Sequence, residues 1–168
     1  MAGGNRRCSA TTPAPRVRAV DTTGAGDAFT GALAVAWRDG PEAYLGMTVT
    51  GFPNMFMITG PGSPSVLSNM IVSVEQHVEW IADCIVYLRA GGYSSIEATP
   101  QAQADWVAHT TALVAPTVLV HSSCNSWYNG GNVPGKKRMY LGYTAGIPEY
   151  RRRCDEIAAD GYTGFTVA

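Results

Sequence analysis

The sequence predicts an α/β fold with long helices, few strands and an incomplete sheet. A glycine- and proline-rich turn at residues 60–64 precedes about 25 residues whose apolar side chains recur in steps of three and four. A second helical stretch opens at Thr99 and Pro100, a pair suited to the cap and first position of a helix. Only short apolar runs separate these stretches, so any sheet has few strands.

The first half of the chain is expected to contain two strand–turn–helix units. Residues 1–15 are rich in Gly, Thr, Pro and Arg and are expected to be flexible. The expected elements are a strand at 17–20, a helix at 28–37, a strand at 55–59 and a long helix that Gly91 and Gly92 end. Ser63 is the expected cap of the long helix. Its predicted apolar face consists of Leu67, Met70, Ile71, Val74, Val78, Ile81, Ile85 and Leu88.

The second half is expected to be more irregular. A helix should run from Pro100 to about Val114, and another should start at Pro148 and end before Gly161. Between them lies a stretch at 121–135 that is rich in Ser, Asn and Gly and is typical of a loop. Short strands are predicted at 118–120, 139–143 and 165–167.

The composition gives no support for a nucleic-acid-binding, membrane, disulfide-rich or metal-binding protein. The 168 residues are 46% hydrophobic and only 15% charged, and the net charge of −1 gives no reason to expect a nucleic-acid or membrane partner. The four cysteines contain no CxxC pair, which favours a reducing, cytoplasmic location over a disulfide framework. No secretory signal or membrane span is recognisable. The three histidines have no metal-ligand spacing, so no metal is predicted, and His77 is expected on a polar helix face with Glu75 and Glu79.

The segment at 21–29 reads Asp-Thr-Thr-Gly-Ala-Gly-Asp-Ala-Phe between a short strand and a helix. Glycines let the backbone approach a ligand, and N–H groups at a helix start favour anions. This string resembles the signature of ribokinase-like sugar kinases. The resemblance implies that Asp27 is the catalytic base. It also implies that the backbone amides of Gly24, Ala25, Gly26 and Asp27 form the anion hole, and that the reaction uses ATP and Mg²⁺. The alternative is a strand–turn–helix that binds no substrate.

A second set of strings runs in order along the rest of the chain. They are GPEAYLG at 40–46, FPNMF at 52–56, GPGSPSVLSNM at 60–70, VEQHVEW at 74–80, SWYNGGNVPGK at 126–136, and short matches near 150–165. Together they resemble the C-terminal part of Baeyer–Villiger monooxygenases of the cyclohexanone and phenylacetone group. The fold class thereby implied is a partial FAD/NAD(P)-binding, Rossmann-type domain.

This second resemblance implies roles for particular residues. Gly60, Gly62 and Ser63 would lie beside the flavin, and the region from Ser65 to Met70 would border the ketone pocket. Trp127 would sit on a loop that closes over the nicotinamide cofactor, because hinge freedom and one aromatic anchor suit a lid. Lys136 starts a short basic run that would meet the NADPH phosphate or simply be solvated. Arg151 to Arg153 are expected to form a solvated face.

The same resemblance implies that much of the enzyme is not represented. The family's two GxGxxG fingerprints, its active-site arginine and its signature motif lie upstream of the matching region. The chain is therefore expected to consist of a flexible N-terminus (1–15), a kinase-like segment (16–38) and a monooxygenase-like segment (39–168).

Three functional hypotheses follow. The first is a fragment of an FAD- and NADPH-dependent oxygen-inserting enzyme that is inactive alone and binds neither cofactor tightly. The second is a remnant of a carbohydrate kinase, and the third is a non-enzymatic interaction domain. Exposed apolar faces of the long helix are expected, which would leave the chain open to self-association.

Overall fold

The computed structural model describes residues 40–64, 67–121, 127–131, 134–135 and 137–168. Its longest helix is α2 (Met70–Gly91), followed by strand β1 (Ile96–Ala98) and helix α3 (Pro100–Val114). The short helix α4 (Val118–His121) and the 3₁₀ turn η1 (Trp127–Asn129) come next. Helix α5 (Ile147–Ala159) and strand β2 (Phe165–Val167) complete the described elements. The predicted strand at 17–20 and helix at 28–37 lie outside the described residues.

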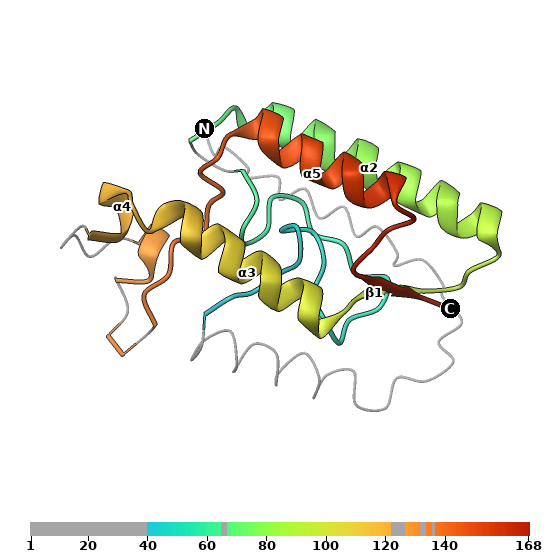
Figure 1. Ribbon diagram of the computed structural model, residues 1–168, viewed down its shortest axis with the longest axis horizontal. Helices are drawn as coiled ribbons and strands as arrows, with labels where there is room; N and C mark the ends of the chain where they lie inside the picture. Colours follow the sequence, from blue (N-terminus) through green and yellow to red (C-terminus); the bar gives the residue numbers. More distant parts are fainter. Residues whose placement is uncertain (1–39, 65–66, 122–126, 132–133, 136) are drawn as a thin grey trace, which may run out of the picture.

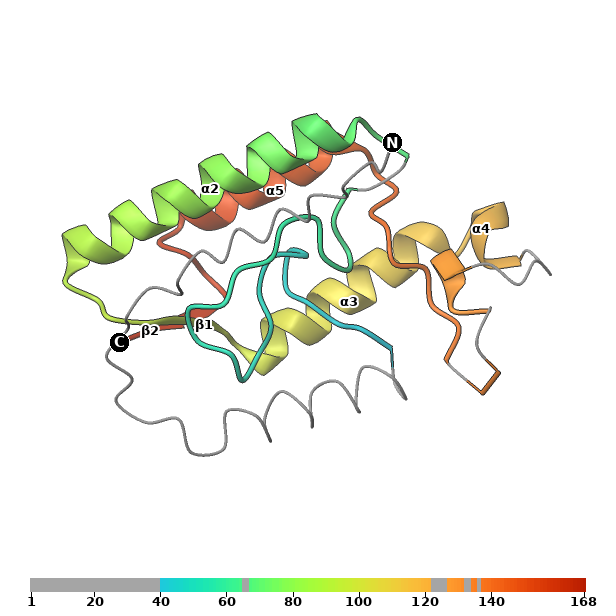
Figure 2. The same cartoon turned by 180° about the vertical axis from the view of Figure 1, so that it is seen from behind.

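The helices enclose a segment with little regular secondary structure. Figure 1 shows α2 and α5 side by side on one side of the molecule and α3 on the other, with residues 40–64 passing between them. Seen from behind, the same arrangement holds, and β1 and β2 lie at the end where α2 leads into α3 (Figure 2). The two strands pair antiparallel, with Ile96 opposite Val167. The fold is thus a mixture of helix and strand with one small sheet in the part described.

Local signals set two helix ends as predicted. Thr99 caps α3 by accepting a hydrogen bond from the backbone N–H of Ala102 at 3.2 Å, and Pro100 occupies the first turn. Gly92 ends α2 in the left-handed conformation, and its N–H donates to the carbonyls of Arg89 and Leu88. Helix α5 and strand β2 also fall where they were predicted.

The start of the long helix was predicted wrongly. Asn69, not Ser63, caps α2, and its side chain accepts from the N–H of Ile71 at 3.0 Å. The Ser63 hydroxyl instead donates to the Gly60 carbonyl at 2.7 Å within the preceding turn. A short polar side chain can cap a helix or close a turn, and at Ser63 the turn uses the hydroxyl.

Two predicted strands are also wrong. Residues 55–59 form no strand, because their backbone bonds are scattered; the N–H of Met57 donates to the Met47 carbonyl at 2.7 Å, for example. Residues 118–120 belong to helix α4. Residues 139–143 are extended but contribute only one isolated bridge, between Gly142 and Ser63. β propensity alone does not produce a strand when no neighbouring strand is available to pair with it.

The core lies between the helices and the 40–64 segment and is rich in aromatic rings. Its buried members are Tyr44, Leu45, Met47, Trp80, Cys84, Leu88, Ile96, Ala98, Trp106, Tyr143, Tyr150, Cys154 and Tyr162. Cys84 and Cys154 are both unpaired thiols. Among the described residues, no helix is long and apolar enough to cross a membrane.

The face that α2 turns toward this core is not the predicted apolar face. The buried side chains of α2 are Ser73, Gln76, His77, Trp80, Cys84 and Leu88. Of the predicted apolar face, Leu88 is buried and Ile81 partly buried, whereas the others described are exposed. The expectation that the chain exposes apolar residues of this helix is therefore confirmed.

Candidate functional site

Two tight turns form the centre of the candidate site. In the first, the N–H of Tyr44 donates to the Thr48 carbonyl at 2.8 Å, and the N–H of Met47 donates back to the Tyr44 carbonyl at 3.1 Å. Leu45 and Gly46, at the corner, both have positive φ angles, 56° and 69°. Positive φ at both central residues is typical of the tight turns that close hairpins. The conformation is costly for leucine, and complete burial of the Leu45 side chain offsets that cost.

The second turn is the Gly-Pro-Gly-Ser stretch at residues 60–63. The N–H of Gly60 donates to the Gly46 carbonyl at 3.0 Å, which ties this turn to the first one. The N–H of Gly62 donates to the Leu141 carbonyl at 2.8 Å, and the N–H of Ser63 donates to the Gly60 carbonyl at 3.2 Å. All three amides are therefore occupied by carbonyls of the chain.

The two turns approach so closely that glycine is required at Gly46. A Cβ atom there would lie 2.5 Å from the Ser63 Cβ and 2.8 Å from the Ser63 backbone nitrogen. A Cβ at Gly60 would lie 2.6 Å from the Gly46 carbonyl oxygen. These glycines serve contact between backbones inside the protein.

A buried chain of hydrogen bonds connects both turns to α2 and α5. The N–H of Thr59 donates to Nδ1 of His77 at 2.9 Å, so the imidazole proton lies on Nε2, which is 2.8 Å from the Tyr150 hydroxyl. The Tyr150 hydroxyl donates to the Leu45 carbonyl at 2.5 Å. Burial lowers the pKa of His77 to about 4 and raises the pKa of Tyr150 well above 10. Both groups are therefore neutral near pH 7.

Helix α3 holds the second turn from the other side. The indole N–H of Trp106 donates to the Gly62 carbonyl at 3.1 Å. The Tyr143 ring stacks on Trp106 with the centroids 5.6 Å apart and the planes at 6°. The N–H of Tyr143 also donates to the Ser63 carbonyl at 2.9 Å, so the stacked pair secures the turn through two separate bonds.

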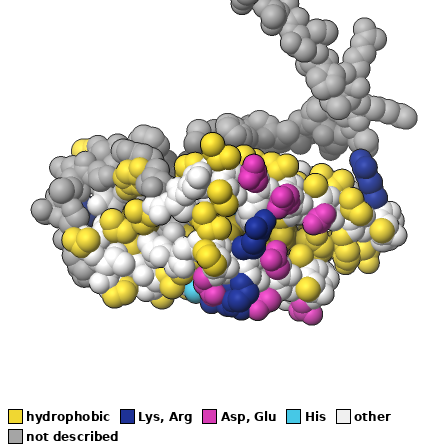
Figure 3. Space-filling view, turned by 90° about the horizontal axis from the view of Figure 1, so that it is seen from above, with side chains coloured by type: hydrophobic (Ala, Val, Ile, Leu, Met, Phe, Trp, Pro, Cys, Tyr) yellow, Lys and Arg dark blue, Asp and Glu magenta, His cyan; other side chains and the backbone are white. Residues whose placement is uncertain are grey.

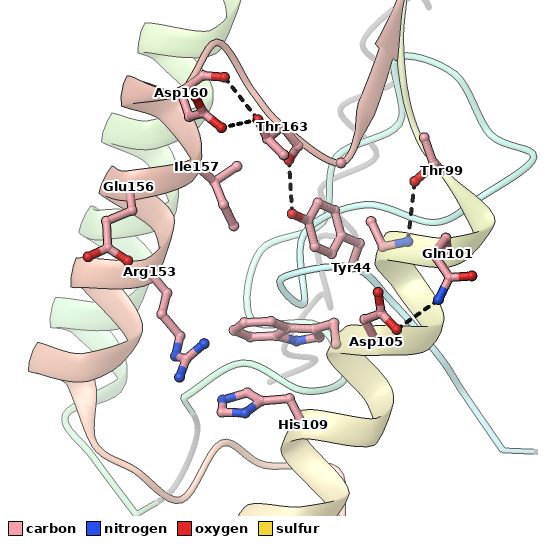
Figure 4. Close-up of a pocket in the computed structure, with 13 residues that line it drawn as sticks. Tyr44, Thr99, Gln101, Asp105, His109, Arg153, Glu156, Ile157, Asp160 and Thr163 are labelled. Atoms are coloured by element: carbon pink, nitrogen blue, oxygen red, sulfur yellow. Dashed lines mark hydrogen bonds between the residues drawn. The ribbon is translucent and has the colours of Figure 1, made fainter.

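An open cavity of about 610 Å³ lies beyond Trp106, between α3 and α5. Figure 4 shows His109 and Asp105 on the α3 side of this cavity, and Arg153 and Ile157 on the α5 side. The pKa of His109 is lowered by burial and by the positive charge of Arg153. The sequence did not predict this cavity, because its lining comes from segments far apart in the chain.

The predicted lid region is anchored at both of its ends. The N–H groups of Met139 and Leu141 donate to the carbonyls of Asn129 and Tyr128 at 3.2 and 3.3 Å. The rings of Tyr128 and Tyr140 stack with centroids 6.4 Å apart. Since Leu141 also accepts from Gly62, the base of this loop adjoins the turn at 60–63.

The predicted site residues fall into two groups. Gly60, Gly62 and Ser63 share one turn, and Met70 lies at the exposed first position of α2. The 3₁₀ turn η1 begins at Trp127, whose side chain is not described. Ser65, Lys136 and the kinase-like residues Gly24, Ala25, Gly26 and Asp27 lie outside the described residues.

The sequence interpretation of His77 was wrong. His77 is fully buried and does not share a polar face with Glu75 and Glu79. A signal was present, since His77, Trp80 and Cys84 recur in steps of three and four like an apolar stripe. This helix therefore has two neighbouring faces with helical spacing. The more apolar face was predicted to be buried, but the face with His77 is the buried one.

The basic run at residues 151–153 is a solvated face, as predicted. Arg151 pairs with Glu79 across to α2 at 2.8 Å. Arg152 and Arg153 pair with Glu149 within α5 at 2.7 and 2.8 Å. Among the described residues, no group of three His, Cys, Asp or Glu side chains could hold a metal ion.

Comparison with known proteins finds similarity to two families. Residues 4–44 match the model of the pfkB family carbohydrate kinases. The chain is 40% identical over 131 residues to a cyclohexanone 1,2-monooxygenase of Acinetobacter sp., covering 78% of this chain and 23% of the relative. It is also 40% identical over 127 residues to a Baeyer–Villiger monooxygenase of Pseudooceanicola batsensis, covering 76% and 23%.

Solved structures show the similarity to monooxygenases as well. A steroid monooxygenase bound to NADP is 44% identical, with a TM-score of 0.71 over 80% of this chain and 24% of that one. Over about four fifths of its length, the chain is similar to a segment of the Baeyer–Villiger monooxygenases. The OTEMO complex with FAD and NADP is 34% identical, with a TM-score of 0.72 over 81% and 24%. The chain thus spans about a quarter of the length of its Baeyer–Villiger relatives.

The turn at 60–63 does not fit a phosphate cradle. Its amides already bond to carbonyls of the chain, and Asn69 occupies the amide of Ile71 at the start of α2. A cofactor phosphate needs free N–H groups. None of the amides at 60, 62, 63 and 71 is therefore available to bind a phosphate.

Proposed function

We propose that residues 38–168 function as a part of an FAD- and NADPH-dependent Baeyer–Villiger monooxygenase and do not turn over a ketone alone. In this role the segment supplies a rigid cofactor-facing surface and the loop that contains Trp127. The rest of a Rossmann-type enzyme supplies the sites that bind the dinucleotides. The main observation behind this proposal is that the backbone N–H groups of the turn at 60–63 all donate to carbonyls of the chain itself. No N–H group of this turn is free to bind a phosphate. The flavin would supply the oxygen chemistry when bound.

The proposed cofactor-facing residues are Gly60, Gly62, Ser63, Ser65 and Met70, with Trp127 and Lys136 on the loop. The bridge between Ser63 and Gly142 supports this grouping, since it joins the turn to the strand-like stretch that closes the loop. The bond from Trp106 to the Gly62 carbonyl supports a rigid turn. Rigid support is what a cofactor-facing surface requires.

FAD binding tests the proposal directly. The full chain is dialysed against FAD and its absorbance near the flavin bands is measured after gel filtration. We expect no stoichiometric retention, because the pyrophosphate has no described amide cradle. Tight one-to-one retention by the chain alone would contradict the proposal.

A second candidate function follows from the pfkB match over residues 4–44. We propose as the alternative that the chain retains carbohydrate-kinase chemistry with Asp27 as the base. ATP-dependent phosphorylation of a sugar that is abolished by Asp27→Asn would support this alternative. Absence of turnover across a panel of sugars would exclude it.

The two buried, unpaired thiols Cys84 and Cys154 support a reducing, cytoplasmic compartment. We propose that location for the chain. Recovery of the chain in the cytosolic fraction after cell fractionation would support it, and recovery in a membrane or secreted fraction would contradict it.

A further inference from the structure

None of the described residues that line the open cavity between α3 and α5 belongs to the proposed cofactor-facing set. The volume of this cavity, about 610 Å³, lies in the range of pockets that hold small molecules. Ala102 and Trp106 line it from α3, and Ile157 lines it from α5. The Tyr44 ring lies between the two helices (Figure 4). The cavity therefore has an apolar surface against which the uncharged part of a ligand would pack.

Several hydrogen-bond donors of this cavity are already used within the chain. The Tyr44 hydroxyl donates to the Thr163 carbonyl at 3.0 Å. The indole N–H of Trp106 donates to the Gly62 carbonyl at 3.1 Å. The side-chain amide of Gln101 donates to a carboxylate of α3 at 2.8 Å. An anionic ligand would have to compete with these bonds for its donors.

The ion pairs of α5 leave no spare positive charge at the cavity. Arg153, the one basic residue among the described lining residues, pairs with Glu149 at 2.8 Å. Glu156 also lines the cavity and pairs with Arg152. Figure 3 shows acidic and basic side chains together in one band on the side of the molecule that α2 and α5 form. Burial and the charge of Arg153 lower the pKa of His109, so this ring is neutral near pH 7 and adds no positive charge.

Two carboxylates of the cavity have no such compensation. Asp105 of α3 and Asp160, which follows α5, both line the cavity and form no ion pair among the described residues. Their hydrogen bonds come from the neutral side chains of Gln101 and Thr163. Figure 4 shows Asp160 at the end of the cavity away from Arg153, and the seven residues between them correspond to about 10 Å of helix. The uncompensated charge of the cavity is therefore negative.

We propose that this cavity, named the α3–α5 cavity, binds a small organic cation that carries a primary ammonium group on an apolar body. The ammonium group would lie toward Asp105 and Asp160, because its three N–H groups need acceptors and its charge needs an unpaired carboxylate. The apolar body would pack against Ile157 and the Tyr44 ring. This site is separate from the proposed function, since it uses neither the turn at 60–63 nor the loop assigned to the cofactors.

Three probes with the same ring and different charges test the inference. Benzylammonium, benzyl alcohol and benzoate are titrated into the full chain near pH 7, and the ring signals of His109 are followed by NMR. His109 lines the cavity, and His109→Gln assigns its signals. The cavity variant carries Asp105→Asn and Asp160→Asn. The control variant carries Asp83→Asn and Asp155→Asn, which remove exposed carboxylates outside the α3–α5 cavity.

We expect benzylammonium to shift the His109 signals saturably and to bind more tightly than the other two probes. The cavity variant should bind benzylammonium roughly threefold to tenfold more weakly, which is the size expected for the loss of two exposed ion pairs. The control variant should bind it as the parent does. Both substituted positions of the cavity variant are exposed, and circular dichroism confirms that its helices remain.

Benzoate binding as tightly as benzylammonium would overturn the inference, and so would the absence of a saturable shift with benzylammonium. An equal loss in the cavity and control variants would also overturn it, because benzylammonium would then respond to the overall charge of the chain. The retention of FAD is measured separately, so failure of this inference leaves the proposed function unaffected.

Discussion

The Nε2 atom of His77 in α2 lies 2.8 Å from the hydroxyl oxygen of Tyr150 in α5, and both side chains are buried. The Tyr150 hydroxyl donates a hydrogen bond to the Leu45 carbonyl, at the corner of the first turn. One hydroxyl therefore joins two helices and a turn that are far apart in sequence.

Tyr150→Phe should destabilise the fold by about 1–3 kcal/mol. The substitution keeps the ring but leaves Nε2 of His77 and the Leu45 carbonyl buried without a partner. Urea denaturation of parent and variant measures the difference in free energy of unfolding. Tyr93→Phe, at an exposed ring, is the control and should change stability little. Equal effects of the two substitutions would show that the buried bonds contribute nothing.

Acid should weaken the fold before carboxylates titrate. The pKa of His77 is lowered to about 4 in the folded chain from 6.5, so the unfolded chain binds the proton more readily. The contribution of neutral His77 to the free energy of unfolding is therefore complete above pH 6.5. It falls by about 2–3 kcal/mol as the pH decreases toward 4. His109, whose pKa is also lowered, adds loss in the same direction.

His77→Gln isolates this contribution. Thermal unfolding measured at intervals from pH 7 to pH 4.5 should show a shallower slope in His77→Gln than in the parent. A variant without a titratable group at an exposed polar site, Gln101→Ala, controls for general sensitivity to substitution. An unchanged slope in His77→Gln would assign the acid sensitivity to other groups.

Gly46→Ala should cost about 2–4 kcal/mol, because the new Cβ would overlap Ser63 and the backbone has a positive φ. Gly51→Ala is the matched control, since Gly51 also has a positive φ, 87°, but nothing lies within 4 Å of a Cβ there. Its cost should be limited to about 1–2 kcal/mol of backbone strain. Denaturation measures the loss of unfolding free energy in each variant. The extra loss in Gly46→Ala is the free-energy cost of the steric overlap between the two turns. Equal costs would mean that the turns are not in tight contact.

The thiols of Cys84 and Cys154 should be unreactive in the folded chain. Burial raises the pKa of Cys84 to about 11 and that of Cys154 to about 12, so neither forms a thiolate near pH 8. In a chain carrying Cys8→Ser and Cys124→Ser, a thiol reagent should label nothing until denaturant is added. Rapid labelling of the native chain would show that the core between α2 and α5 opens.

The sequence predicted those features whose signals are local or shared with relatives. Thr99 with Pro100 and Gly92 set helix ends through contacts within a few residues, so α3 and the end of α2 were predictable. The ordered strings from residue 40 onward indicated the monooxygenase family without any geometry. The strand β2 was predicted from its composition, although its pairing with β1 was not.

Only the tertiary structure showed which segments pair as strands, which residue caps α2 and which face of α2 is buried, because each depends on which neighbouring groups are available. Residues 55–59 have strand composition but no strand to pair with, and Ser63 bonds Gly60 in its own turn and leaves the capping of α2 to Asn69. His77 is buried because Tyr150 and Thr59 satisfy both of its nitrogens, an arrangement that brings together residues 73 positions apart. The apolar stripe on α2 was visible in the sequence, but only the structure showed that the helix turns its other face to the core. Hydrophobic periodicity identifies which faces can be buried, and the partners that pack against the helix determine which face is buried.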